Sequence, residues 1–196
     1  QSLYSKSSIN QLIIGGLFFI CVWLNIDDIF SLLPEKFSVG KYVVLYIGIS
    51  QLFNMASGLN GEIIINSKFY RYDLYSNIFL VFLTIATNYY FIQKFGIDGA
   101  AMATAISILI FNLTRLIILK INLNIQPFTV KTLYTILLLA ILYIIINNLP
   151  SLSFPLVNII YKSFVAIIIF TPSLYLLNLS EDITSFLNEL RSKYLS

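Results

Sequence analysis

Histidine is absent from this sequence of 196 residues, and cysteine occurs once, as Cys21. Without histidine the chain lacks a common general acid–base group and a common zinc ligand. This argues against membrane-bound acyltransferases and intramembrane metalloproteases, and a single cysteine excludes an intrachain disulfide. The sequence contains neither a nucleophile–base pair nor a metal-ligand set. We therefore expect no enzyme activity, no catalytic residue, no metal site and no cofactor.

Charged residues are also scarce. They make up 11% of the chain, against about 25% in a typical soluble domain. Hydrophobic residues make up 58%, and the mean hydropathy is +0.86. The net charge of +3 is small and the cations are dispersed, so the basic stripe of a nucleic-acid-binding surface is missing. The composition indicates a membrane protein without a nucleic-acid partner.

Long apolar stretches dominate the sequence, and a transmembrane helix needs about 20 such residues. Short connections separate them, so no domain outside the membrane is interposed. We predict an all-α, polytopic membrane helix bundle of about six transmembrane helices. The six stretches are 9–33, 42–66, 74–92, 99–119, 132–147 and 155–177.

Lysine and arginine are distributed unequally between the two ends of these predicted helices. Cytoplasmic loops carry the excess of these residues, so both termini of this segment are expected in the cytoplasm. The cytoplasmic side would hold Lys6, Lys68, Arg71, Arg115, Lys120, Lys131, Arg191 and Lys193, and the outer side Lys36, Lys41, Lys94 and Lys162.

The stretch 95–107 predicts a turn followed by a helix that another helix can approach closely. Gly96 and Gly99 permit the turn. Gly99 with Ala103, and Ala101 with Ala105, are small residues four positions apart, a spacing that favours close helix packing in lipid.

Polar residues fall on one face of each of three consecutive predicted helices. Lipid cannot satisfy such groups, so they face protein or water. Two interpretations stay open: hydrogen bonds between helices, or the wall of a substrate cavity. For Glu62 and Arg115 a third is open, contact with the cytoplasmic surface, which an arginine can reach with its long side chain. The cavity candidates are Gln51, Asn54, Glu62, Asn77, Thr84, Asn88, Thr104, Ser107 and Arg115.

Two carboxylates are candidates for binding a coupling ion, because acidic groups within a span are expensive and commonly functional. Asp28 shares a helical face with Cys21 and Asn25, and Glu62 lies on the predicted second helix. The alternative for Asp28 is a position in the outer headgroup region. Arg115 is instead a candidate for holding an anionic headgroup, because its planar fork suits phosphate.

Five short segments occur in an order that resembles the C-terminal half of bacterial polysaccharide flippases. These belong to the O-antigen transporter type of the multidrug/oligosaccharidyl-lipid/polysaccharide exporter superfamily. The segments are SGLNG at 57–61, KFYRYDLYSN at 68–77, GIDGAAMATAIS at 96–107, FNLTRL at 111–116 and QPF at 126–128.

The resemblance implies two lobes that alternate access to a polar cavity, carrying lipid-linked oligosaccharide on a polyprenyl diphosphate across the bacterial inner membrane for O-antigen or other cell-surface polysaccharide. Residues 1–128 would end the second lobe, 129–179 would be an appended helix pair, and 180–196 a cytoplasmic amphipathic tail. Its partners would be the substrate, membrane lipids and a missing N-terminal lobe. Since the chain begins with Gln1, we expect a fragment of a longer protein. Glu62 stands where the family often has a small polar or apolar residue, so it inherits no family role.

Two alternatives remain at this point. A cation-coupled multidrug exporter of the same superfamily would use a buried carboxylate such as Asp28 or Glu62. A non-transporting membrane subunit would use the polar residues only to join its helices.

Overall fold

The computed structural model describes residues 2–185 of the chain. Within that range it is helical, without strands, which confirms the all-α class. The elements are α1 (Ser2–Leu24), α2 (Ile26–Ser31), the 3-10 helix η1 (Glu35–Gly40), α3 (Lys41–Ala56), α4 (Asn60–Ile65), α5 (Arg71–Leu123), α6 (Val130–Asn147) and α7 (Pro155–Leu176).

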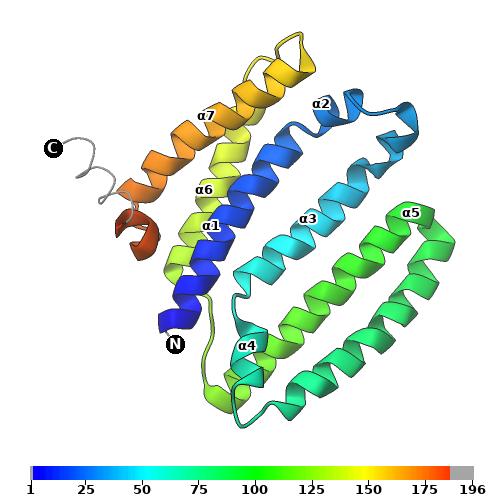
Figure 1. Cartoon of the computed structure of the whole chain (residues 1–196), viewed down its shortest axis with the longest axis vertical. Coiled ribbons are helices and arrows are strands. Elements are labelled where there is room, and N and C mark those ends of the chain that lie inside the picture. The colour runs from blue at the N-terminus through cyan, green and yellow to red at the C-terminus, as the bar shows by residue number, and fades with distance from the viewer. Residues whose placement is uncertain (1, 186–196) are drawn as a thin grey trace.

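The long helices run side by side as a fan, with α7 at one edge and the bent α5 at the other (Figure 1). Helix α1 lies centrally, because it contacts α3, α6 and α7, whereas α5 packs on α3 and α4. We call the end of the fan that holds α4 and the start of α1 the α4 end. The opposite end, which holds α2 and the bend of α5, is the α2 end.

Two consecutive glycines of α1 face its neighbours α3 and α6. A Cβ atom at Gly15 would collide with Met55 of α3, and one at Gly16 would collide with Leu139 of α6. The two glycines therefore leave room for the Met55 and Leu139 side chains to pack directly on the backbone of α1. The apolar core continues from here through Ile9, Ile13, Ile20, Leu142, Ile146, Ala166, Phe170, Leu174 and Leu179.

Helix α5 is a hairpin of two arms, residues 71–95 and 97–123, bent at Gly96. That glycine has φ +57° and ψ −127°, a conformation that L side chains rarely adopt. On the second arm Gly99, Ala101, Ala103 and Ala105 are buried. A Cβ atom at Gly99 would strike the Phe91 carbonyl of the first arm. The predicted turn and close packing on small residues are both confirmed.

The predicted single helices over 9–33 and 42–66 are wrong, because each is broken. Asn25 separates α1 from α2, and Gly58, with φ +60°, turns the chain between α3 and α4. The predicted face of Gln51, Asn54 and Glu62 is therefore interrupted, since Glu62 belongs to a different helix. The other four predicted stretches lie on the two arms of α5, on α6 and on α7. The expected tail helix over 180–196 lies largely outside the described residues.

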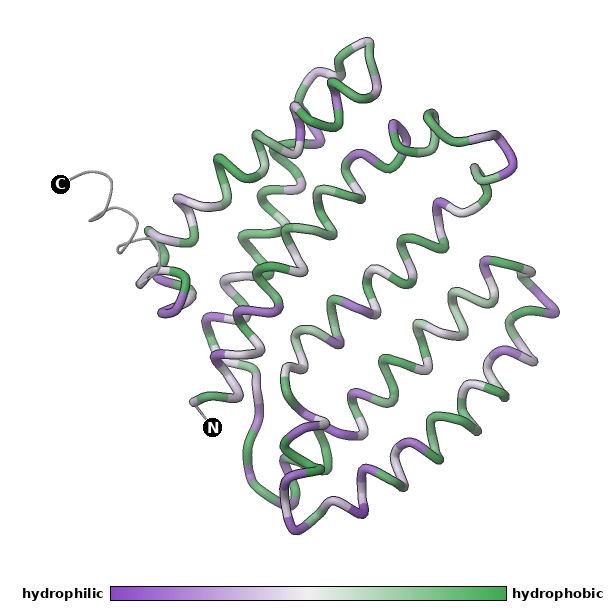
Figure 2. Tube along the Cα trace, in the orientation of Figure 1, coloured by the Kyte–Doolittle hydropathy of each residue, from purple (hydrophilic) through white to green (hydrophobic). Residues whose placement is uncertain are grey.

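Apolar side chains cover the outside of the fan as well as its core. Figure 2 shows hydrophobic residues along the length of the helices. Phe82 on α5 and Phe164 on α7 are 68% and 62% exposed. Within the described residues, α1, α5, α6 and α7 are each long and apolar enough to cross a membrane. Such an exterior indicates a membrane protein, because water would disfavour so much exposed apolar surface.

The Gly96 backbone generates a prediction about stability. Gly96→Ala should destabilise the fold by about 1–3 kcal/mol, because alanine is strained at this φ and ψ. Nothing lies within 4 Å of the added methyl group, so the loss would come from backbone strain alone.

The matched control is Gly40→Ala. Gly40 has φ −78° and its added Cβ would make only ordinary contact with Phe30. Both variants would be unfolded by titration with dodecyl sulfate in mixed micelles. Equal stability of the two variants would contradict the strained bend.

Candidate functional site

Arg115 forms an ion pair with Asp73 at the α4 end, between the two arms of α5. Its Nη2 atom donates to the Asp73 carboxylate, and both side chains are 15% exposed. The Phe111 ring centroid lies 4.2 Å from the guanidinium carbon. A Cβ atom at Gly61 of α4 would lie 2.7 Å from Nη1, so the absent side chain makes room for the guanidinium. Arg115 therefore lies among α4 and both arms of α5, with its charge balanced.

Hydrogen bonds extend this cluster. The Asn77 amide donates to the second carboxylate oxygen of Asp73 over 2.8 Å. The Asn60 amide of α4 donates to Asn112 over 2.9 Å, and both asparagines are buried. Within residues 2–185, the buried Nε of Arg115 has no hydrogen-bond partner. The structure thus joins segments 57–61, 68–77 and 111–116, which the sequence places far apart. We call Gly61, Asp73, Asn77, Phe111 and Arg115 the arginine cluster.

Between the bend at Gly96 and the α4 end, polar residues join the two arms of α5 to each other. The Thr87 and Ser107 hydroxyls lie 2.9 Å apart, and Ser107 is 1% exposed. Thr104 donates back to the Ala100 carbonyl, and Asn88 donates to that of Thr84. Ser107 therefore serves as a link between helices, whereas Thr84, Asn88 and Thr104 are half-buried.

The candidates on α3 and α4 lie elsewhere. Gln51 and Asn54 are exposed and join each other through a hydrogen bond of 3.4 Å. Gln51 also lines a largely apolar groove of about 600 Å³ between α1 and α3. Glu62 is exposed on α4, and no side chain within residues 2–185 forms an ion pair with it.

A second polar cluster joins α1 and α2 to α7 at the α2 end. Asn158 donates to the Asp28 carboxylate over 2.6 Å, and Asn25 donates to Ser163 over 3.2 Å. Lys162, 8% exposed, donates to Ser151 over 3.4 Å. Asp28 is thus bound to a neighbouring helix, which lends no specific support to its role as a coupling site. In the described part of the chain, no group of three or more cysteines and acids is arranged to hold a metal ion.

Sequence reasoning missed the pairing of Arg115 with Asp73 and the burial of Asn112, Asn158 and Lys162. The ion pair had a signal in the sequence. Asp73 and Arg115 lie at nearly equal distances along the chain from Gly96, so a hairpin bent there brings them to the same end. The burial of Asn158 and Lys162 had no such signal, because it depends on α7 packing against α2.

Comparisons with known proteins give no match. No family model, no curated protein and no solved structure matches the chain. The resemblance of its short segments to polysaccharide flippases therefore stays a prediction.

The arginine cluster predicts strong coupling between its two charges. Arg115→Gln and Asp73→Asn should each destabilise the fold by about 2–4 kcal/mol, because each leaves one charge buried without its partner. The double variant should cost less than the sum of the two by at least about 1 kcal/mol. The free energy of unfolding in mixed micelles is the measurement.

The control for this double-mutant cycle is the ion pair of Lys41 with Asp27 at the α2 end, where the Asp27 side chain is 80% exposed. Removing those charges should change stability by less than about 1 kcal/mol. Additive effects at Arg115 and Asp73 would mean that their ion pair contributes nothing to the fold.

Proposed function

We propose that the chain is the C-terminal part of a flippase that carries lipid-linked oligosaccharide, on a polyprenyl diphosphate, across the bacterial inner membrane. In this proposal the chain crosses the membrane six times. These crossings are α1 with α2, α3 with α4, the two arms of α5, α6 and α7. Both ends of this segment lie in the cytoplasm, which places the α4 end at the inner surface. The missing N-terminal lobe of the same protein would complete the transport cavity.

The observation that carries the proposal is the arginine cluster. Arg115 is a cation on an apolar helix with a side chain only 15% exposed, and charged groups within membrane segments are costly and commonly serve transport. It also lies where three segments of the suggested family meet. An ion pair with Asp73 keeps the guanidinium in place and neutralised when no substrate is bound. The proposal thus rests on the chemistry of a charge-balanced arginine and on its position among the family-like segments.

The ion pair suggests how a diphosphate is held. A diphosphate carries more negative charge than one carboxylate and accepts bidentate hydrogen bonds from a guanidinium. It replaces Asp73 on Arg115 when the cavity is open to the cytoplasm. Rocking of the two lobes then exposes the site to the outer side, and loss of the substrate restores the ion pair. Ion-pair exchange thereby keeps the Arg115 charge balanced at each step, while the released Asp73 carboxylate keeps its hydrogen bond from Asn77.

Broken helices next to the arginine cluster also support a transporter. Transport proteins often build substrate sites from discontinuous membrane helices, whose backbone is irregular where it lines a cavity. Here α3 ends at Ala56, the chain turns at Gly58, and α4 brings Gly61 against Arg115.

Transport by the full-length protein tests the role of Arg115. The double variant Asp73→Asn with Arg115→Gln removes both charges and leaves no unpaired charge behind. We expect it to insert into the membrane and still fail to transport. Lipid-linked oligosaccharide would then accumulate on the cytoplasmic leaflet of a strain that carries only this variant.

The control is the double variant Lys41→Gln with Asp27→Asn, which removes a pair at the α2 end. It should transport normally at matched expression. Normal transport by the Asp73 and Arg115 variant as well would reduce the pair to a structural role and overturn the assignment of Arg115.

Solvent labelling separates a water-filled cavity from a bundle whose polar groups only join helices. In a background with Cys21→Ser, we expect a polar maleimide to react with Asn54→Cys, Asn77→Cys and Thr104→Cys in membranes. Ser107→Cys should stay unreactive because that side chain is buried in the link to Thr87.

Phe82→Cys provides the control for exposure to lipid. Phe82 is 68% exposed and apolar, so it should face hydrocarbon and not react. If the three polar positions react as weakly as Phe82→Cys, the polar residues do not line a cavity. A non-transporting membrane subunit would then replace the flippase.

A further inference from the structure

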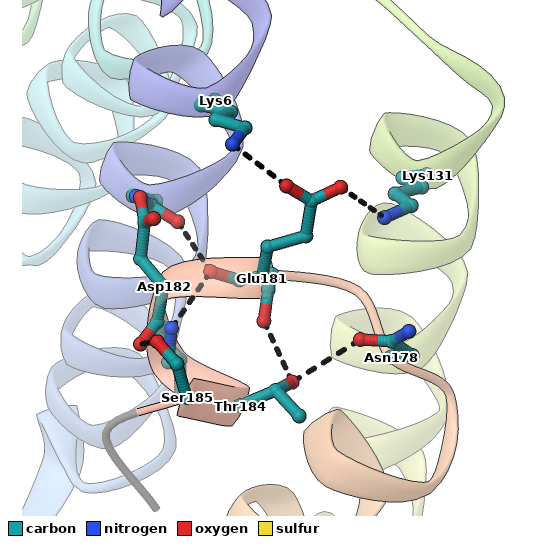
Figure 3. Close-up of polar contacts among 10 residues, drawn as sticks. Lys6, Lys131, Asn178, Glu181, Asp182, Thr184 and Ser185 are labelled. Carbon is teal, nitrogen blue, oxygen red and sulfur yellow. Dashed lines mark hydrogen bonds and ion pairs between the residues drawn. The ribbon is translucent and has the colours of Figure 1, made fainter.

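A separate cleft lies at the α4 end, on the far side of α1 from the arginine cluster. Its volume is about 400 Å³, and it lies between α1, the start of α6 and the segment that follows α7. Figure 3 shows the polar contacts that surround it. The residues that line it include Lys6 and Asn10 of α1, Lys131 of α6, and Glu181 and Asp182.

The segment after α7 is folded back against the bundle. Asn178, with φ +47°, reverses the chain, and Leu179 enters the apolar core with 1% exposure. Ser180 donates to Asn10 over 2.6 Å, and Asn10 donates to Asp182, also over 2.6 Å. These contacts fix the position of Glu181 between two lysines.

Glu181 is the shared counter-ion of both lysines. One carboxylate oxygen lies 2.7 Å from Lys6 Nζ, and the other lies 4.0 Å from Lys131 Nζ. The hydrogen bond from Lys6 and the charges of both lysines hold the pKa of Glu181 below its ordinary value. Glu181 is therefore ionised at neutral pH. The Glu181 side chain is 58% exposed, and those of Lys6 and Lys131 are 46% and 41% exposed, so a dissolved anion can reach both lysines.

The carboxylate does not fill the space between the lysines. The contact with Lys131 is long, whereas a phosphate carries more oxygens in a wider, tetrahedral arrangement, and lysine commonly binds phosphate as a point charge. Apolar side chains of Ile9, Val130 and Leu179 line the same cleft. A ligand with both a phosphate and an apolar part would thus match the cleft better than free phosphate.

We propose that this cleft binds the phosphate headgroup of an anionic phospholipid between Lys6 and Lys131, in exchange for Glu181. The proposal rests on the membrane insertion of the proposed function but concerns a site outside the transport cavity. The two positive charges of the lysines equal the two negative charges of Glu181 and Asp182 within the cleft. The headgroup would therefore replace Glu181 and not simply add a charge. The headgroup would release Glu181 and loosen the segment after α7 from α1 and α6.

Lipid binding to the purified full-length chain in detergent tests the exchange at neutral pH. Native mass spectrometry would compare dioctanoyl phosphatidylglycerol, which is anionic, with dioctanoyl phosphatidylcholine, which has no net charge. We expect preference for the anionic lipid. The double variant Lys6→Gln with Lys131→Gln should weaken its binding about fivefold, the scale of an exposed charge contact.

Glu181→Gln distinguishes exchange from a purely structural ion pair. Removal of the competing carboxylate should tighten lipid binding, although it also removes a contact within the fold. The matched control, Lys68→Gln with Lys120→Gln, removes two lysines near the α4 end that do not line the cleft. This control should bind the anionic lipid like the unaltered chain.

Three outcomes would overturn the proposal. In the first, the Lys6 and Lys131 variant binds as tightly as the control. In the second, Glu181→Gln weakens binding. In the third, inorganic phosphate displaces the lipid at equal concentration, which would make soluble phosphate the ligand. Because transport is not measured, failure here leaves the flippase proposal standing, and lost transport with intact lipid binding leaves this one standing.

Discussion

The ion pair of Arg115 with Asp73 fixes the first arm of α5, the outermost helical segment on its side of the bundle, against the second arm. The first arm of α5 lies at the edge of the fan, where many of its large side chains are exposed. The pair fixes this arm to the second arm at the α4 end, and Gly96 fixes the bend at the other. Because a charge inside an apolar assembly is costly without a partner, removing either residue destabilises the position of the other. The bend of the hairpin therefore also determines how Arg115 is neutralised, because it brings Asp73 to the guanidinium.

Uncharged polar residues elsewhere are also paired with a polar group on a neighbouring helix. Thr87 with Ser107 joins the two arms, Asn60 with Asn112 joins α4 to α5, and Asn158 with Asp28 joins α7 to α2. Each places a polar group opposite another on a neighbouring helix, since the surrounding apolar side chains offer no hydrogen bond. These contacts select one arrangement among helices whose apolar faces are otherwise similar.

Within residues 2–185 the ion pairs lie at the ends of the fan, whereas hydroxyls and small residues join the two arms of α5 between those ends. At the α4 end, two sets of charges lie on different sides of α1. The Asp73 and Arg115 side chains of the arginine cluster are each only 15% exposed, which suits a site that opens only with substrate. The Lys6, Glu181 and Lys131 contacts are half-exposed, which suits exchange with a ligand from the surroundings. The two proposed sites therefore differ in how readily a ligand from the surroundings can reach them.

Composition and spacing alone determined that the chain is helical, apolar on the outside and bent near Gly96. These features follow from local properties: hydropathy over about 20 residues, and the backbone freedom of glycine. Continuous helices over 9–33 and 42–66 were predicted wrongly, because hydropathy does not register a break at Asn25 or Gly58. The partners of the polar residues were decided by tertiary structure. Arg115 was expected to reach headgroups or bind an anion, but the fold placed Asp73 against it, because contacts between distant segments depend on how whole helices pack.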